Sequence, residues 1–131
     1  MGVIIQGRIF SSEEKAGLLK PIIYCYPSRD LDSEAISINL LMAEKLVKFQ
    51  PNRRTMRLEQ CFNQVLDTLH NGVLIKDFDV MFNPLYQVDL LVIMVVTCKR
   101  KPFSIIWPGK CEDGKLFYAE EGYPDYKVFN I

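Results

Sequence analysis

The sequence predicts an α/β domain in which a small, mainly parallel sheet is flanked by helices, with short antiparallel strands at the C-terminal end. Over the first two-thirds of the 131 residues, strand-like apolar runs alternate with segments of helical periodicity, an order that implies right-handed crossovers between parallel strands. The last third carries short strand-like runs with brief connections, which favour antiparallel pairing. We expect a single domain over 1–131, built as a two- or three-layer sandwich.

The N-terminal third predicts one strand and one helix. Residues 21–27 (PIIYCYP) form an apolar, β-branched and aromatic run bounded by prolines, which is typical of a buried strand. Helix-starting side chains follow at Asp30, Asp32 and Ser33. Apolar positions at mostly helical spacing then predict a helix over 33–49.

The middle of the chain holds a clear helical pattern between two ambiguous segments. Residues 54–57 fit either a strand or a helix, and we favour a short strand because they alternate weakly. Helical spacing predicts a helix over 58–70, closed by Asn71 and Gly72, which both tolerate left-handed backbone. Residues 73–82 fit either a strand or a last helical turn.

The C-terminal part predicts four strands. Val88–Thr97 has the strongest strand prediction, because a continuous apolar run of this length suits burial on both faces of a sheet. A second buried strand is predicted over 102–107, and two short strands over 115–121 and 126–131.

A sharp corner joins these strands. Trp107 is expected to anchor the end of a strand in the core, while Pro108 and Gly109 turn the chain. Asp113 and Gly114 then reverse it into the next strand.

Composition excludes several classes of protein. Lys plus Arg equals Asp plus Glu at 16 each, so no global field favours nucleic acid or an anionic membrane. The longest apolar run is far too short to span a bilayer, and the N-terminus lacks the pattern of a signal peptide or a myristoylation site. We therefore expect a cytoplasmic protein with no membrane partner.

The four cysteines predict neither a metal site nor a cofactor. They include no C-x-x-C pair, and His70 is the only histidine, which argues against tetrahedral zinc. Cys25 and Cys98 lie in apolar runs, where we expect small core residues rather than a disulfide, a metal ligand or a nucleophile.

Basic loops at strand ends suggest one possible site. Ligands of open parallel sheets collect at the carboxyl ends of the strands. On the predicted topology, Arg29, Lys99, Arg100 and Lys101 lie there and are candidates for phosphate or nucleic-acid contact, although no glycine-rich phosphate loop occurs. A second basic cluster lies on the predicted opposite rim and comprises Arg53, Arg54 and Arg57.

Acidic residues suggest a metal-dependent alternative. Asp77 and Asp79 share one face if their segment is extended, and Asp89 precedes the strand predicted to start at Val88. A small hydrolase or nuclease that uses these carboxylates is one hypothesis. His70 is expected only to complement a helix dipole, so no catalytic residue is assigned.

The C-terminal third, KPFSIIWPGKCEDGKLFYAEEGYPDYKVFNI, resembles the ending of the BrxB family of the BREX phage-defence systems. The matching positions are Pro102, Trp107, Pro108, Gly109, Asp113, Gly114, Leu116, Phe117, Tyr126 and Phe129. The early strand in PIIYCYPSRDLDSE is also similar. The chain has only TCKRK where members carry a proline, an arginine and a helix, and it is shorter than a typical member. The resemblance implies an accessory protein of a multiprotein defence assembly, without established catalytic residues.

The favoured hypothesis is a non-enzymatic interaction or accessory protein whose partners are other proteins. Tyr118, Tyr123 and Tyr126 are the candidate contact residues, because tyrosine supplies a large interface area at low entropic cost. A nucleotide- or nucleic-acid-binding domain is the main alternative, and the oligomeric state stays open.

Overall fold

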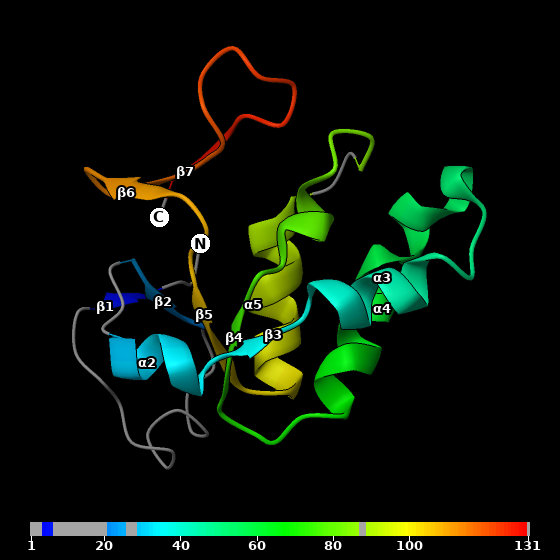
Figure 1. The fold of residues 1–131 in the computed structure, drawn as a ribbon, viewed down its shortest axis with the longest axis horizontal. Helices are drawn as coiled ribbons and strands as arrows, with labels where there is room; N and C mark the ends of the chain where they lie inside the picture. The colour runs from blue at the N-terminus through cyan, green and yellow to red at the C-terminus, as the bar shows by residue number, and fades with distance from the viewer. Residues whose placement is uncertain (1–3, 7–20, 26–28, 87–88, 131) are drawn as a thin grey trace.

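The computed structural model describes residues 4–6, 21–25, 29–86 and 89–130. In this part of the chain, a parallel sheet of five strands, sheet A, has the order β1-β2-β5-β4-β3 (Figure 1). Its strands are β1 (Ile4–Gln6), β2 (Ile22–Tyr24), β3 (Ile36–Ser37), β4 (Val73–Lys76) and β5 (Phe103–Ile106). The predicted parallel sheet is confirmed.

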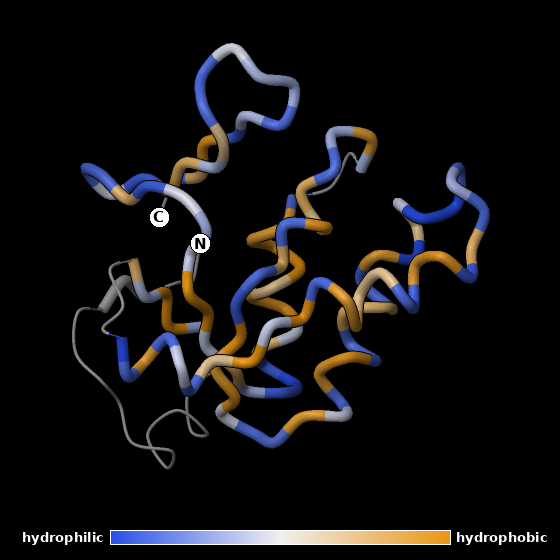
Figure 2. Tube along the Cα trace, viewed as in Figure 1, coloured by the Kyte–Doolittle hydropathy of each residue, from blue (hydrophilic) through white to orange (hydrophobic). Residues whose placement is uncertain are grey.

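Helices cover both faces of sheet A, which makes three layers. On one face, alternate residues such as Ile23 and Ile105 join the main core with side chains of α3 (Asn39–Leu46), α4 (Arg54–Asp67) and α5 (Leu90–Arg100). On the other face, Ile22 and Ile106 pack with Leu31 of α2 (Arg29–Glu34). Figure 2 shows the hydrophobic residues concentrated along β5 and α5. None of the helices in the described ranges is long and apolar enough to cross a membrane.

The C-terminal strands form a separate sheet rather than additions to one edge of sheet A. This antiparallel sheet B comprises β6 (Lys110–Glu112), β7 (Lys115–Tyr118) and β8 (Lys127–Asn130), in the order β6-β7-β8. The two predicted C-terminal strands are thus confirmed as β7 and β8, and β6 is an additional strand. Predicted positions 26–28, 88 and 131 lie outside the described residues.

The strand predicted over Val88–Thr97 is wrong, because most of this segment is the helix α5. The side chain of Asp89 caps the helix by accepting hydrogen bonds from the backbone N–H groups of Leu91 and Val92, at 3.1 and 3.3 Å. A short apolar run does not by itself distinguish a buried strand from a buried helix. The capping aspartate and the two basic residues of the last turn, Lys99 and Arg100, were the helix signals.

Two more predictions in the first half need correction. The helix predicted over 33–49 is divided into α2 and α3, because Ile36 pairs with Ile75 and makes the edge strand β3. The strand predicted over 54–57 is the first turn of α4, which follows the 3-10 helix η1 (Pro51–Arg53). The segment 73–82 contains both of its predicted alternatives, β4 and the 3-10 helix η2 (Asp79–Phe82).

The corner between the two sheets has the predicted form. Asp113 and Gly114 have φ values of 50° and 72°, as the two-residue turn of a tight hairpin requires. Gly109 is the residue that permits the close approach, because a Cβ atom there would collide with the carbonyl oxygen of Phe117. That oxygen accepts a hydrogen bond of 2.9 Å from Nε1 of Trp107, so Trp107 anchors the corner.

The expectation that Cys25 is an unpaired core residue is wrong. Cys25, at the end of β2, forms a disulfide with Cys111 of β6, which lies 86 positions later in the chain. Cys61 and Cys98 are buried thiols outside this disulfide, and burial raises the pKa of both. The bond ties the central part of sheet A to sheet B.

Candidate functional site

An aromatic cluster lies at the carboxyl ends of β4 and β5, where open parallel sheets usually bind ligands. Phe78 and Trp107 follow these two strands, and their ring centroids lie 6.3 Å apart. Phe82 stacks on Tyr118 of β7 at 3.8 Å, and Phe129 of β8 packs edge-on against Trp107 at 5.7 Å. The inner face of sheet B therefore fills the usual ligand position with aromatic side chains.

Polar contacts hold this cluster in place. The hydroxyl of Tyr118 donates a hydrogen bond of 3.0 Å to Oδ2 of Asp79. Burial and the hydrogen bond to this carboxylate raise the pKa of Tyr118, so its phenol stays neutral at ordinary pH. Together with the Cys25–Cys111 disulfide, these contacts fix sheet B over sheet A.

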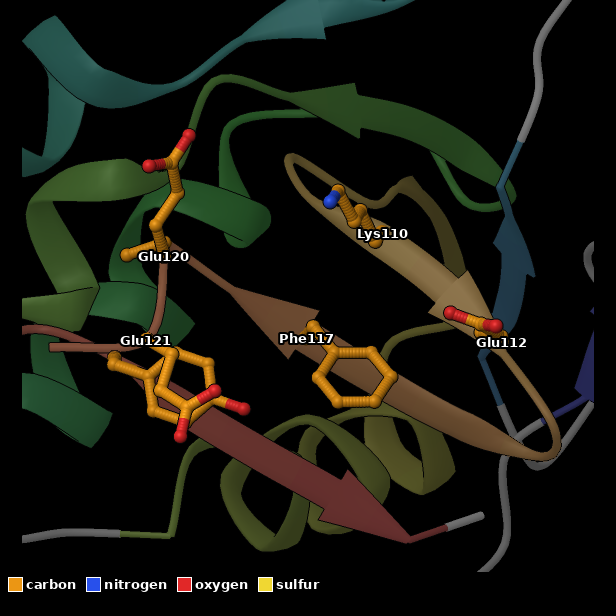
Figure 3. A pocket seen from close by; sticks show the side chains of 7 residues that line it. Lys110, Glu112, Phe117, Glu120 and Glu121 are labelled. Carbon is orange, nitrogen blue, oxygen red and sulfur yellow. The ribbon is translucent and has the colours of Figure 1, made fainter.

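The outer face of sheet B carries a pocket of about 390 Å³. Lys110 of β6 pairs with Phe117 of β7, which places both side chains on this face. Figure 3 shows the ring of Phe117 between Lys110 and Glu112 on one side and Glu120 and Glu121 on the other. The sheet B pocket is lined by Lys110, Glu112, Phe117, Ala119, Glu120, Glu121 and Tyr126.

The charge of the sheet B pocket is unbalanced. Three carboxylates, from Glu112, Glu120 and Glu121, face a single ammonium group, that of Lys110. None of these four side chains makes a hydrogen bond or an ion pair with another described residue. No three acidic, histidine or cysteine side chains of the described chain come together as metal ligands. The pocket therefore combines a net negative charge with apolar ring surface.

The wall of the sheet B pocket is shaped by a strained turn after β7. Ala119 has a φ of 62°, in the left-handed region that residues with a Cβ atom seldom adopt. Backbone hydrogen bonds from Tyr123 to Glu120 and from Tyr126 to Tyr123 then fold the segment that leads to β8. The strained conformation carries Glu120 and Glu121 away from the sheet, to the far side of the pocket.

The three candidate tyrosines have different environments. Tyr118 is 8% exposed and faces the aromatic cluster, so it is not a surface contact. Tyr126 lines the sheet B pocket. Tyr123 is 61% exposed in the turn between β7 and β8. A contact role for Tyr123 and Tyr126 stays a prediction.

The structure separates the candidate basic residues. Arg29 begins α2, the helix that follows β2, and lies on the side of the carboxyl end of sheet A. Lys99, Arg100 and Lys101 end α5 and precede β5, so they lie at the opposite, amino end. These three residues were expected at the carboxyl end of the sheet, because a strand was predicted where the structure has α5. The guanidinium of Arg100 also bonds Asn63 and Asp67, with a 2.9 Å ion pair to Asp67.

Two of the candidate acidic residues have structural roles. Asp79 accepts the hydrogen bond from Tyr118, and Asp89 caps α5. Asp77 has a φ of 51° in the turn after β4, and His70 is exposed after α4. The geometry gives the metal-dependent alternative no support, because two of its three carboxylates are already engaged.

Sequence reasoning missed most of the pocket residues. Only Tyr126 was among the candidate site residues. A signal was present for three of the others, because Lys110, Glu112 and Phe117 occupy alternate positions on either side of the Asp113–Gly114 turn. Such a pattern places their side chains on one face of a hairpin.

Comparison with known proteins gives no indication of function, so a proposal must rest on the fold and on the sheet B pocket. No family model matches the chain, and no curated protein or solved structure matches it significantly. The BrxB resemblance therefore stays an expectation.

Proposed function

We propose that this protein is a non-enzymatic interaction domain, and that the sheet B pocket receives a basic segment of a protein partner. The observation that carries the proposal is the combination of aromatic rings with carboxylates that have no partner among the described residues. The usual ligand position of the parallel sheet is occupied by the aromatic cluster. The exposed face of sheet B is thus the better candidate surface.

The chemistry of the pocket favours an organic cation over a metal ion. The carboxylates of Glu112, Glu120 and Glu121 line the hollow but do not converge as metal ligands. A guanidinium or an ammonium on a long side chain can contact separated carboxylates and also lie over the ring of Phe117 or Tyr126. Such cation–π contacts contribute about 0.5–1 kcal/mol at exposed sites.

Fluorescence anisotropy with a labelled hexa-arginine peptide tests this proposal, with a hexa-glutamate peptide as the negative probe. We expect binding of the arginine peptide that weakens as salt is added, because the charges are exposed. The double variant Glu120→Gln/Glu121→Gln should weaken binding about tenfold, since exposed ion pairs contribute up to about 1 kcal/mol each.

Phe117→Ala should also weaken peptide binding while the fold is retained. The control for the loss of a carboxylate is Glu59→Gln on α4, which removes one exposed carboxylate away from the pocket and should leave binding unchanged. Equal affinity for the two peptides, or an equal loss in the control, would contradict the proposal.

The resemblance to BrxB suggests where a protein partner would be found. On this proposal, the domain acts in a multiprotein assembly of a phage-defence or mobile-element system. The identity of the neighbouring genes is the test. Consistent proximity to defence genes would support this setting, and neighbours of unrelated function would remove it.

A further inference from the structure

A strongly basic surface lies at the turn between α3 and α4. Between residues 45 and 57 there are five cationic side chains and no acidic one. We call this surface the basic corner, and its cations are Lys45, Lys48, Arg53, Arg54 and Arg57. Figure 2 shows the turn between the two helices as hydrophilic.

Two of these arginines fix the shape of the basic corner. Nε of Arg54 donates hydrogen bonds of 3.1 and 3.2 Å to the carbonyl oxygens of Leu46 and Phe49, which holds the end of α3 against the start of α4. The guanidinium of Arg57 lies 5.6 Å from the ring centroid of Phe49 and bonds Gln60. The corner is therefore a defined shape rather than a loose loop.

The other side chains of the corner are available for contact. Lys48 and Arg53 are exposed, and neither side chain has a hydrogen-bond or ion-pair partner within the described ranges. Val47 is 67% exposed and Met56 is 83% exposed beside them. Exposed apolar side chains among unpaired cations are suited to a partner surface that is acidic and partly apolar.

We propose that the occupant of the sheet B pocket is the basic corner of a second copy of this chain, an inference that rests on the function proposed above. The pocket supplies Glu112, Glu120 and Glu121 with two rings, and the corner supplies cations with exposed Val47 and Met56. The chain carries 16 charges of each sign, so two copies have no net repulsion.

The arrangement of the two surfaces makes the contact intermolecular. Figure 1 shows sheet B and the turn between α3 and α4 on opposite sides of the molecule. A copy therefore does not fill its own pocket with its own corner. Because the contact joins unlike surfaces, it is head-to-tail and leaves a free pocket and a free corner at the ends, so it extends into rings or open chains.

Sedimentation velocity over a range of protein concentrations and salt concentrations tests the inference. We expect assemblies that grow with concentration and dissociate as salt is added. Arg53→Glu and Glu121→Lys should each raise the dissociation constant at least tenfold. Arg53→Glu places an acidic side chain at a helix N-terminus, where it does not destabilise the helix. Lys99→Glu is the control for Arg53→Glu, because it makes the same change in net charge, and it should assemble as the parent does.

Mixing the two variants gives the sharpest result. Arg53→Glu keeps an intact pocket and Glu121→Lys keeps an intact corner, so an equimolar mixture should form a heterodimer that does not extend further. Each variant alone should stay monomeric at the same concentration.

A chain that stays monomeric at millimolar concentration while hexa-arginine still binds would overturn this inference and leave the proposed function standing. Loss of both peptide binding and self-association would remove both proposals. Binding of the corner to duplex DNA or to phosphatidylserine vesicles, lost in Arg53→Glu while the chain is monomeric, would also overturn the inference and assign the corner to another polyanion.

Discussion

Sheet A and sheet B bury their strands differently. The central strands of sheet A are buried almost throughout, with every residue of β2 and β5 inaccessible to solvent or nearly so. Along each strand of sheet B, more buried positions alternate with more exposed ones. Sheet A is thus a scaffold with helices on both faces, whereas sheet B covers the aromatic cluster with one face and leaves the other available. The half-covered sheet carries the pocket.

Substitution of Phe82, which should break the contact between the two sheets, should have the largest effect on stability. Phe82 is buried between Tyr118, Trp107 and Phe129, so Phe82→Ala should lower the free energy of unfolding by about 3–5 kcal/mol. Urea denaturation measures this loss. The matched variant is Phe117→Ala on the outer face, which should cost less than about 1 kcal/mol and act mainly on peptide binding. Similar losses for the two phenylalanines would contradict the distinction between the faces.

Removal of the disulfide should loosen sheet B more than sheet A. Cys25→Ser/Cys111→Ser opens a covalent link across 86 positions and should lower the free energy of unfolding by about 2–4 kcal/mol. Hydrogen exchange should then show faster exchange of the β6 and β7 amides than of the β5 amides. Treatment of the parent chain with dithiothreitol removes the same disulfide without a substitution and is the comparison for the double variant. A Cys61→Ser control is less suitable because Cys61 is buried. An unchanged stability after complete reduction would show that the aromatic cluster alone holds the sheets together.

Substitution of Tyr118 should have the smallest effect and the clearest pH dependence. Tyr118→Phe removes the hydrogen bond to Asp79 and should cost about 1 kcal/mol near neutral pH. The folded state raises the pKa of Tyr118, so its stabilising contribution is complete below the unfolded value of about 10 and is lost as the pH rises through the folded value. Denaturation curves should therefore show a smaller alkaline loss of stability in Tyr118→Phe than in the parent. An identical pH profile would show that the buried phenol does not couple to folding.

Several elements were predictable because their signals are local. Residues 103–106 form β5 because a short apolar run between polar connectors is typical of a buried strand, and Asp113–Gly114 determines a hairpin by its own backbone preferences. The strand at Val88–Thr97 was wrong because an apolar run is compatible with burial in either a sheet or a helix. The interruption at Ile36 was missed because it depends on pairing with Ile75, a contact distant in sequence.

The candidate site was predictable only in part for the same reason. Tyr126 was among the expected contact residues. Tyr118 was expected at the surface, but it is the residue next to Phe117 on β7, so its side chain lies on the buried face while Phe117 lines the pocket. A shift of one position on a strand reverses the face on which a side chain lies. Without the register of sheet B, the two faces could not be assigned.

The sequence by itself determined the fold class, the mainly parallel sheet, the turn chemistry of Trp107 to Gly114 and the two last strands, because these follow from local periodicity and backbone preference. Only the tertiary structure decided that α5 is a helix, that Cys25 bonds Cys111, and that sheet B fills the usual ligand position of sheet A. These features depend on contacts between residues far apart in the chain, whose partners a single sequence does not specify.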